Sequence, residues 1–240
     1  MNGPAAWIFD LDGTLIDSGL DIALSANVVR SRFGLPGLPV PVLTGYVGDG
    51  VRLLLARTLG HDLESGRTGL PVADALLDEA QVVFAEHYGA HLLDHTRLYP
   101  GVRGVLAELG PAPLCVATNK PRRFALDILA GLGVDELFHA VVGGDDVPVR
   151  KPDPAHLRAC LAGLEVDLAR VVVVGDSPND IAAARGLGAV AVGCTYGLVD
   201  PERVRAAAPD HVVDDITALA GLFPGGTARP RDVIGPGEDA

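Results

Sequence analysis

The sequence predicts an α/β fold: a doubly wound, Rossmann-like parallel sheet core with an inserted small all-helical cap domain. Short apolar runs, each followed by polar or glycine-containing residues, alternate with segments of helical length. After the first run, this order gives way to a long stretch in which the apolar spacing is helical. We therefore expect a core of residues 1–16 and 96–223 and a helical cap of residues 17–95.

Three apolar runs predict buried parallel strands: Trp7-Ile8-Phe9, Pro113 to Ala117 and Val171 to Val174. Helices are expected at Arg122 to Leu132 and at Pro154 to Leu164. In open α/β sheets, ligands bind beyond the carboxyl ends of the strands. Functional side chains are therefore expected just after each run.

The expected cap begins with a helix, because Ser18 and Asp21 have the spacing of a capping box. Residues 34–41 are rich in Gly and Pro and should end that helix. Residues 224–240 contain seven Pro or Gly, which predicts a disordered tail.

Asp10 and Asp12 directly follow the first predicted strand, and residues at this spacing point to the same side of an extended chain. Both carboxylates can therefore face one reacting group. Two anions this close repel each other unless a cation or a proton intervenes, and such oxygen ligands suit Mg²⁺. A simple Asp-Gly turn at Gly13 is the alternative interpretation.

Lysine is scarce: 17 of the 19 basic residues are Arg, and only Lys120 and Lys151 are Lys. A compact ammonium is suited to meet a phosphate oxygen as a point charge. Lys151 lies in a loop fixed by prolines, which favours such a role. Lys120 follows Thr118-Asn119, and for it a phosphate contact and an ordinary surface position remain open.

Four motifs occur in the order found in the haloacid dehalogenase-like hydrolases, which the chain resembles from Trp7 to about Leu222. They are Asp10-Leu11-Asp12-Gly13-Thr14, Thr118-Asn119, Lys151-Pro152 and Gly175-Asp176-Ser177-Pro178-Asn179-Asp180. Within the family, the chain is most similar to the phosphoglycolate phosphatases, through Tyr46 to Arg52 and Thr195-Tyr196-Gly197.

The resemblance implies a Mg²⁺-dependent phosphomonoester hydrolase that works through an aspartyl-phosphate. Asp10 would be the nucleophile and Asp12 the general acid and base. Mg²⁺ would bind Asp10, the backbone carbonyl of Asp12, and Asp176. The phosphoryl oxygens would be held by Thr118, Asn119 and Lys151, with Lys151 stabilising charge.

Two further residues are assigned with alternatives. The resemblance implies that Asp180 holds metal-bound water or positions Lys151, but it could simply close the start of a helix. Arg52 follows the turn Gly48-Asp49-Gly50 and could bind the carboxylate of 2-phosphoglycolate, or it could be a solvated helix residue.

The expected reaction converts 2-phosphoglycolate to glycolate and phosphate. Another small-metabolite or sugar-phosphate phosphatase and a β-phosphoglucomutase-like phosphotransferase remain open, and a non-catalytic phosphate-binding module is a remote alternative. The acid at Asp12 argues against a dehalogenase. Phosphonoacetaldehyde hydrolysis needs a cap lysine, and residues 17–95 contain none.

Composition limits the compartment and the partners that can be expected for the protein. No apolar run approaches the roughly 18 residues of a membrane span, and the N-terminal residues lack the features of a signal peptide. The three cysteines suggest a reduced, cytoplasmic protein. A formal charge of −12 disfavours nucleic acid. We expect a small phosphorylated metabolite as partner, and the sequence does not indicate an oligomeric state.

Overall fold

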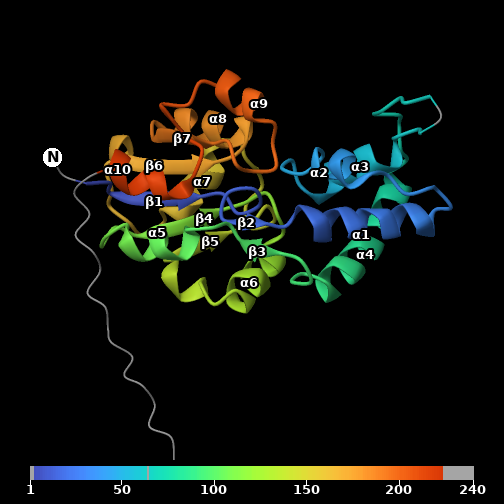
Figure 1. Ribbon diagram of the computed structural model, residues 1–240, viewed down its shortest axis with the longest axis horizontal. Coiled ribbons are helices and arrows are strands. Elements are labelled where there is room, and N and C mark those ends of the chain that lie inside the picture. Colours follow the sequence, from blue (N-terminus) through green and yellow to red (C-terminus); the bar gives the residue numbers. More distant parts are fainter. Residues whose placement is uncertain (1–2, 64, 224–240) are drawn as a thin grey trace, which may run out of the picture.

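The computed structural model describes residues 3–63 and 65–223 (Figure 1). The expected tail of residues 224–240 lies outside the described residues. Within them, six parallel strands form one sheet in the order β5-β4-β1-β6-β7-β8. Their bounds are β1 (Ala6–Phe9), β4 (Leu114–Ala117), β5 (Ala140–Val142), β6 (Val171–Gly175), β7 (Val190–Cys194) and β8 (His211–Val213).

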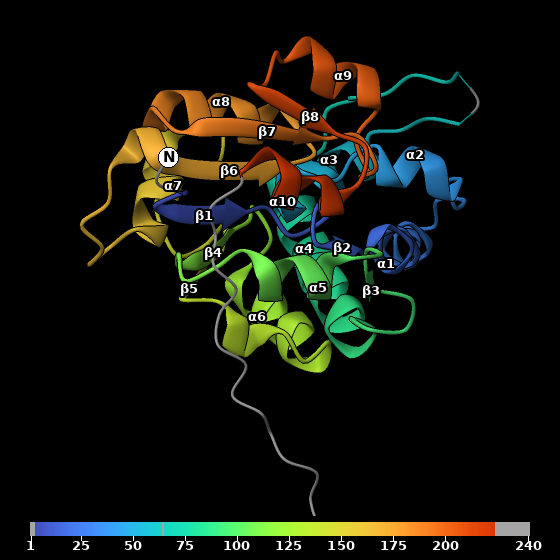
Figure 2. The ribbon, with the colours of Figure 1, turned by 60° about the vertical axis from the view of Figure 1, so that its left-hand side comes forward.

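The first strand lies in the middle of the sheet, where Ile8 is opposite Cys115 of β4 and Val173 of β6. Because successive side chains alternate between faces, Trp7 and Phe9 enter one core and Ile8 enters the other. One core is covered by α5 (Val102–Glu108), α6 (Arg122–Gly131) and α10 (Leu219–Leu222), and the other by α7 (Pro154–Cys160), α8 (Pro178–Leu187) and α9 (Pro201–Ala206). Helices on both faces confirm the doubly wound sheet, whose strands follow one another from β8 at the top to β5 at the bottom of Figure 2.

The cap lies beyond the carboxyl ends of the strands (Figure 1). It contains α1 (Gly19–Arg32), α2 (Val40–Thr44), α3 (Val51–Leu59) and α4 (Asp74–Ala90). The two chain crossings pair as antiparallel strands, β2 (Ile16–Asp17) and β3 (Arg97–Leu98). This ribbon ties the outgoing chain to the returning chain, and the domain boundaries expected at 16/17 and 95/96 stay a prediction. Short 3₁₀ turns complete the core: η1 (Asp135–Leu137), η2 (Leu168–Arg170) and η3 (Ile216–Ala218).

The two predicted core helices are present, although α7 ends at Cys160 and not at Leu164. The residues after it turn through Gly163, whose φ of +81° is in the left-handed region that favours glycine. The predicted capping box at Ser18 and Asp21 is wrong. The α1 helix does begin after Ser18, but neither side chain caps it, because both bind partners elsewhere in the chain.

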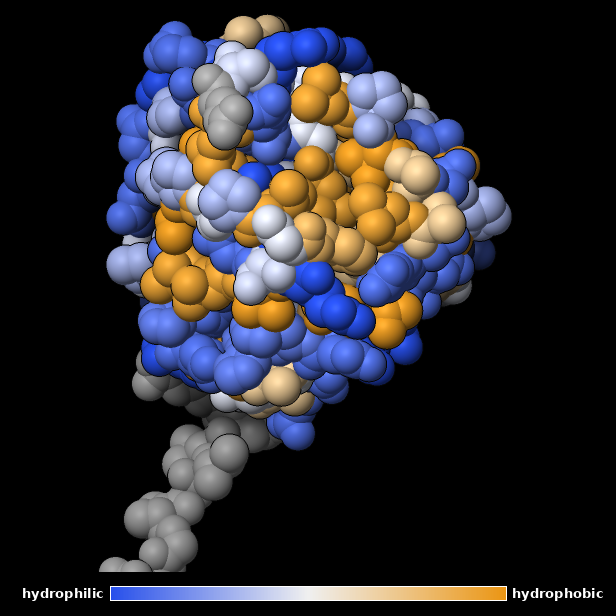
Figure 3. Space-filling model, turned by 90° about the vertical axis from the view of Figure 1, so that its right-hand side faces the viewer, coloured by the Kyte–Doolittle hydropathy of each residue, from blue (hydrophilic) through white to orange (hydrophobic). Residues whose placement is uncertain are grey.

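The outer face of the cap carries apolar side chains among polar ones (Figure 3). On α1, Leu20, Leu24 and Val28 are spaced four residues apart and are 38%, 40% and 36% exposed. Between residues 3 and 223, leaving out residue 64, no helix has the length and apolar character needed to cross a membrane.

Candidate active site

The candidate site lies at the point where the order of successive strands reverses, next to β1. Strands β4, β1 and β6 are neighbours, so the residues that follow them meet at one edge of the sheet. Asp10 continues β1, and its backbone N–H donates to Val174 O at 2.9 Å. Thr118 continues β4 in the same way, donating to Val142 O at 3.0 Å. The backbone ladder therefore fixes these residues at the carboxyl edge.

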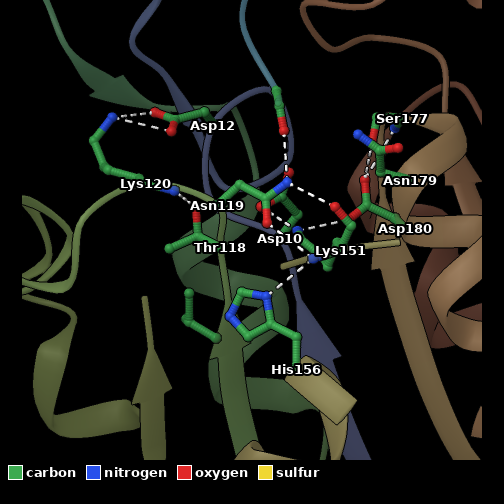
Figure 4. Close-up of polar contacts among 12 residues, drawn as sticks. Asp10, Asp12, Thr118, Asn119, Lys120, Lys151, His156, Ser177, Asn179 and Asp180 are labelled. Carbon is green, nitrogen blue, oxygen red and sulfur yellow. Dashed lines mark hydrogen bonds and ion pairs between the residues drawn. The ribbon is translucent and has the colours of Figure 1, made fainter. Parts of the chain in front are cut away.

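Lys151 is held between two carboxylates (Figure 4). Its Nζ lies 2.7 Å from Asp10 Oδ1 and 2.6 Å from Asp180 Oδ1. Burial opposes the charge of the ammonium, but the two carboxylates outweigh burial and hold the pKa of Lys151 above its ordinary value. The lysine therefore stays charged beside Asp10.

The Asp180 carboxylate makes contacts of two kinds, one to Lys151 and one at the start of a helix, and the sequence had left both open. Its Oδ2 accepts from the backbone N–H of Ser177 at 3.1 Å and from Ser177 Oγ at 2.6 Å, at the start of α8. Its Oδ1 accepts from Lys151 Nζ. The same carboxylate therefore closes a helix start and positions the lysine.

Asp10, Asp176 and Asp180 form a buried acidic cluster, in which one carboxylate oxygen from each lies within 4.8 Å of the others. Burial raises the pKa of Asp10 to about 7 despite the nearby Lys151, and burial with the charges of Asp10 and Asp180 raises the pKa of Asp176. When all three carboxylates are ionised, the single ammonium of Lys151 leaves negative charge in the cluster uncompensated. This donor set fits a hard divalent cation.

The backbone around Asp176 is shaped to admit its side chain. Backbone N–H groups of Leu198 and Val199 donate to Asp176 Oδ2 at 2.7 and 3.2 Å. A Cβ added at Gly13 or Gly197 would lie 2.0 or 2.3 Å from the same oxygen. The glycines in these two loops therefore leave the space that Asp176 occupies beside Asp10.

The Asp12 carboxylate binds Lys120, whereas Asp10 binds Lys151. Lys120 Nζ donates to both oxygens of Asp12, at 2.7 and 3.0 Å, and Ser18 Oγ donates to Oδ1 at 2.5 Å. Lys120 is only 7% exposed, which excludes the ordinary surface position. The Asp12 carboxylate therefore lies outside the acidic cluster, on the side of the site that faces the cap.

Asn119 connects the core to the cap. Its side chain accepts from the Lys151 backbone N–H at 3.0 Å and donates to Lys151 O at 3.1 Å and to Gly48 O at 2.9 Å. A second contact to the same cap turn comes from Asn179, which donates to Asp49 Oδ1 at 2.7 Å. The turn at residues 48–50 is thus docked on the loops that carry the acidic cluster.

The structure does not bring Arg52 to the site. Its guanidinium binds Asp78 Oδ1 at 2.6 Å and Asp74 Oδ1 at 2.5 Å, both on the exposed side of α4. The helix starts where it was expected, but position 52 faces α4 and not the core. The expectation that Arg52 binds a substrate carboxylate therefore has no support in this arrangement.

A small cavity of about 40 Å³ lies between core and cap. Its polar lining comes from Asp10, Asp12, Thr118, Asn119, Lys120 and Tyr88, and its apolar lining includes Ile22, Val47, Val51, Leu54, Phe84 and Phe124. Tyr88 could not be found from the sequence, because its place in the lining depends on which face of α4 meets the core. For Lys120 the sequence does contain a signal, since it is one of only two lysines.

Comparison with known proteins identifies the family of the chain. Residues 5–188 match the model of the haloacid dehalogenase-like hydrolase family. The chain belongs to the haloacid dehalogenase-like hydrolases. The four segments that carried the resemblance in the sequence lie after β1, β4 and β6 and in the loop before α7.

Relatives within the haloacid dehalogenase-like hydrolases match over most of their length. The phosphoglycolate phosphatase of Chromobacterium violaceum is 38% identical over 91% of this chain and 96% of its own. That of Vibrio cholerae is 39% identical over 88% and 93%. A crystal structure described as a predicted phosphoglycolate phosphatase from Haemophilus somnus superposes with a TM-score of 0.85 at 31% identity, covering 92% of this chain and 99% of that one.

Proposed function

We propose that the protein is a phosphomonoester hydrolase that cleaves 2-phosphoglycolate to glycolate and phosphate through an aspartyl-phosphate on Asp10. The observation that carries the proposal is the position of Asp10. Its carboxylate is at the carboxyl edge of the sheet, 2.7 Å from Lys151 Nζ and beside Asp176. A nucleophile with a neighbouring ammonium and a cation-binding cluster suits attack on an anionic phosphorus.

The proposed reaction has two steps. Asp10 attacks phosphorus, the ester bond breaks, and Asp12, which enters this step in its protonated form, gives its proton to the departing oxygen. Water then attacks the phosphorus of the aspartyl-phosphate and gives its proton to Asp12, and the bond between phosphorus and the Asp10 oxygen breaks, which regenerates Asp10 and releases phosphate. Such proton transfer is typically worth ~10²–10⁴-fold in rate. Thr118, the Asn119 backbone N–H and Lys151 hold the other phosphoryl oxygens.

The cation that we propose for the cluster is Mg²⁺, held by Asp10, Asp176 and the backbone carbonyl of Asp12. When bound, it neutralises charge on the phosphoryl group and shields Asp10 from a dianionic substrate. Asp180 acts through Lys151, because both of its oxygens already accept hydrogen bonds.

The choice of 2-phosphoglycolate rests on two supports. Relatives of about 38% identity carry the name phosphoglycolate phosphatase. The cap lining of the cavity, which is apolar or glycine apart from Tyr88, also offers few hydrogen-bond partners to the hydroxyl groups of a hexose, which disfavours a β-phosphoglucomutase-like transferase and a sugar phosphatase.

The setting that we propose is cytoplasmic, with a small phosphorylated metabolite as the partner. Cys115, Cys160 and Cys194 are free and buried, which suits a reducing compartment. The formal charge of −12 disfavours nucleic acid as a partner.

Phosphate release from a panel of small phosphomonoesters tests the proposal, with Mg²⁺ and with a chelator. We expect Mg²⁺-dependent turnover that is fastest with 2-phosphoglycolate. Turnover that is insensitive to the chelator would refute the metal, and a hexose phosphate cleaved much faster than 2-phosphoglycolate would refute the substrate.

A further inference from the structure

The cap side of the cavity holds one charged group that the proposed phosphate site does not use. Among the described residues that line the cavity, Lys120 is the one cation. An ammonium has three N–H donors, and two of them reach the oxygens of Asp12. A third donor is therefore left for a ligand.

Tyr88 of α4 lies beside this ammonium. Lys120 Nζ is 4.9 Å from the centroid of the Tyr88 ring, yet no hydrogen bond joins it to the phenol. Tyr88 is 1% exposed, and its hydroxyl is buried without a partner. A buried hydroxyl that donates to nothing costs free energy, which a ligand accepting from it would recover. Burial raises the pKa of Tyr88 to about 12, so the phenol keeps the proton that it can donate.

The ring of Tyr88 is fixed in place. It stacks on Phe84 with centroids 5.2 Å apart and meets Phe124 edge-on at 5.3 Å. Its hydroxyl is therefore presented at a set position and not on a mobile side chain. The rest of the cap lining is apolar or glycine, so a polar group on the leaving group has few other partners there.

The chemistry of the substrate places a carboxylate at this point. In the proposed reaction the ester oxygen contacts Asp12, and in 2-phosphoglycolate the carboxylate carbon is two bonds from that oxygen. The carboxylate must therefore lie close to Asp12, where the nearest cation is Lys120, 2.7 Å from Oδ1. Arg52, the alternative cation, is held by Asp74 and Asp78.

We propose that Lys120 Nζ and the Tyr88 hydroxyl form the subsite for the carboxylate of the leaving group. This subsite selects small phosphomonoesters that carry a carboxylate on the carbon attached to the ester oxygen. The inference rests on the proposed function and adds which residues recognise the non-phosphate end of the substrate. Core and cap each supply one group, so the subsite is complete only when the cap is docked.

Kinetics with two substrates test the subsite. Ethyl phosphate has the same kind of ester and lacks the carboxylate. Tyr88→Phe should lower kcat/KM for 2-phosphoglycolate by about tenfold to a hundredfold, as expected for a hydrogen bond to a charged group, and should change kcat/KM for ethyl phosphate less than about twofold. Tyr46→Phe removes a hydroxyl that binds His61 in the cap, outside the cavity lining, and should change neither value.

Binding measurements separate this inference from the proposed reaction. In an Asp10→Asn background, which cannot turn over, calorimetry with Mg²⁺ should show 2-phosphoglycolate binding more tightly than ethyl phosphate. Adding Lys120→Met or Tyr88→Phe should remove most of that difference. Equal affinity of the Asp10→Asn protein for the two compounds overturns the subsite, whether or not the wild type hydrolyses either one. A clear preference in binding without hydrolysis by the wild type refutes the reaction and leaves the subsite standing.

Discussion

Asp21 joins the two ends of the cap, and replacing it tests how that junction is held. Its Oδ2 accepts from the backbone N–H of His95 at 3.0 Å and from the Thr96 N–H and Oγ1, both at 2.8 Å. Its Oδ1 lies 2.7 Å from His95 Nδ1. The carboxylate at the start of α1 thus fixes the chain where it leaves the cap.

In Asp21→Asn, the amide can keep the three bonds at Oδ2 if its oxygen takes that position, but the bonds lose their charge. Hydrogen bonds to a charged group are worth about 1.5–3 kcal/mol and neutral ones about 0.5–1.5 kcal/mol, so each of the three loses roughly 1–1.5 kcal/mol and together they lose roughly 3–4.5 kcal/mol. A capping-box residue of the kind that the sequence suggested would be worth ~1 kcal/mol. The size of the loss therefore distinguishes the two roles.

The pH dependence follows from the pKa of Asp21. Burial alone would raise it, but the hydrogen bonds from His95 and Thr96 outweigh burial and hold the pKa of Asp21 below its ordinary value. A lowered pKa means that the stabilisation is fully present above the unfolded value of about 3.9 and is lost as the pH falls through the folded value. The gap between wild type and variant should be full at pH 7 and should shrink below about pH 4.

Urea unfolding of wild type and Asp21→Asn across this pH range measures the gap. Asp127→Asn, at an exposed position on α6, is the matched control and should change stability by less than about 0.5 kcal/mol. A loss of 1 kcal/mol or less at pH 7, or a gap that stays constant down to pH 3.5, would refute the reasoning.

Three further predictions concern the site. Asp10→Asn should abolish turnover of 2-phosphoglycolate without loss of stability, since the amide cannot attack phosphorus and removes a buried charge; residual turnover above a few per cent in a clean preparation contradicts the nucleophile. Asp176→Ala should lose activity that high Mg²⁺ partly restores, because the ion can still bind through Asp10; a titration with no response to Mg²⁺ argues against the ligand. Arg52→Ala should leave KM for 2-phosphoglycolate and for an aryl phosphate equally unchanged, because the guanidinium binds Asp74 and Asp78; a rise confined to 2-phosphoglycolate would bring Arg52 back into the substrate site.

The sheet could be predicted because its strands are buried on both faces. Such strands appear in the sequence as unbroken apolar runs, and the residue after each run lies at the carboxyl edge whatever the helices do. This is why Asp10, Thr118 and Asp176 could be expected together from their positions alone. The structure brings them together as β1, β4 and β6 lie side by side.

Side-chain partners could not be predicted in the same way. Spacing shows that Asp21 lies three residues after Ser18, but not that the chain returns 74 positions later to offer His95 and Thr96 as donors. It shows that Arg52 starts a helix, but not that α4 presents Asp74 and Asp78 to it. Such choices depend on contacts between distant segments, which local pattern does not contain.

The central position of β1 has a consequence for how the site is assembled during folding. Residues 6–9 pair with strands that begin at Leu114 and Val171, so the nucleophile gains its place only after most of the chain is available. Pairings this distant along the sequence form slowly, whereas the cap helices contact one another locally. Trp7, the single tryptophan of the chain, is buried on β1 against Phe9. Its fluorescence during refolding therefore reports the step that builds the catalytic edge, separately from the formation of the cap.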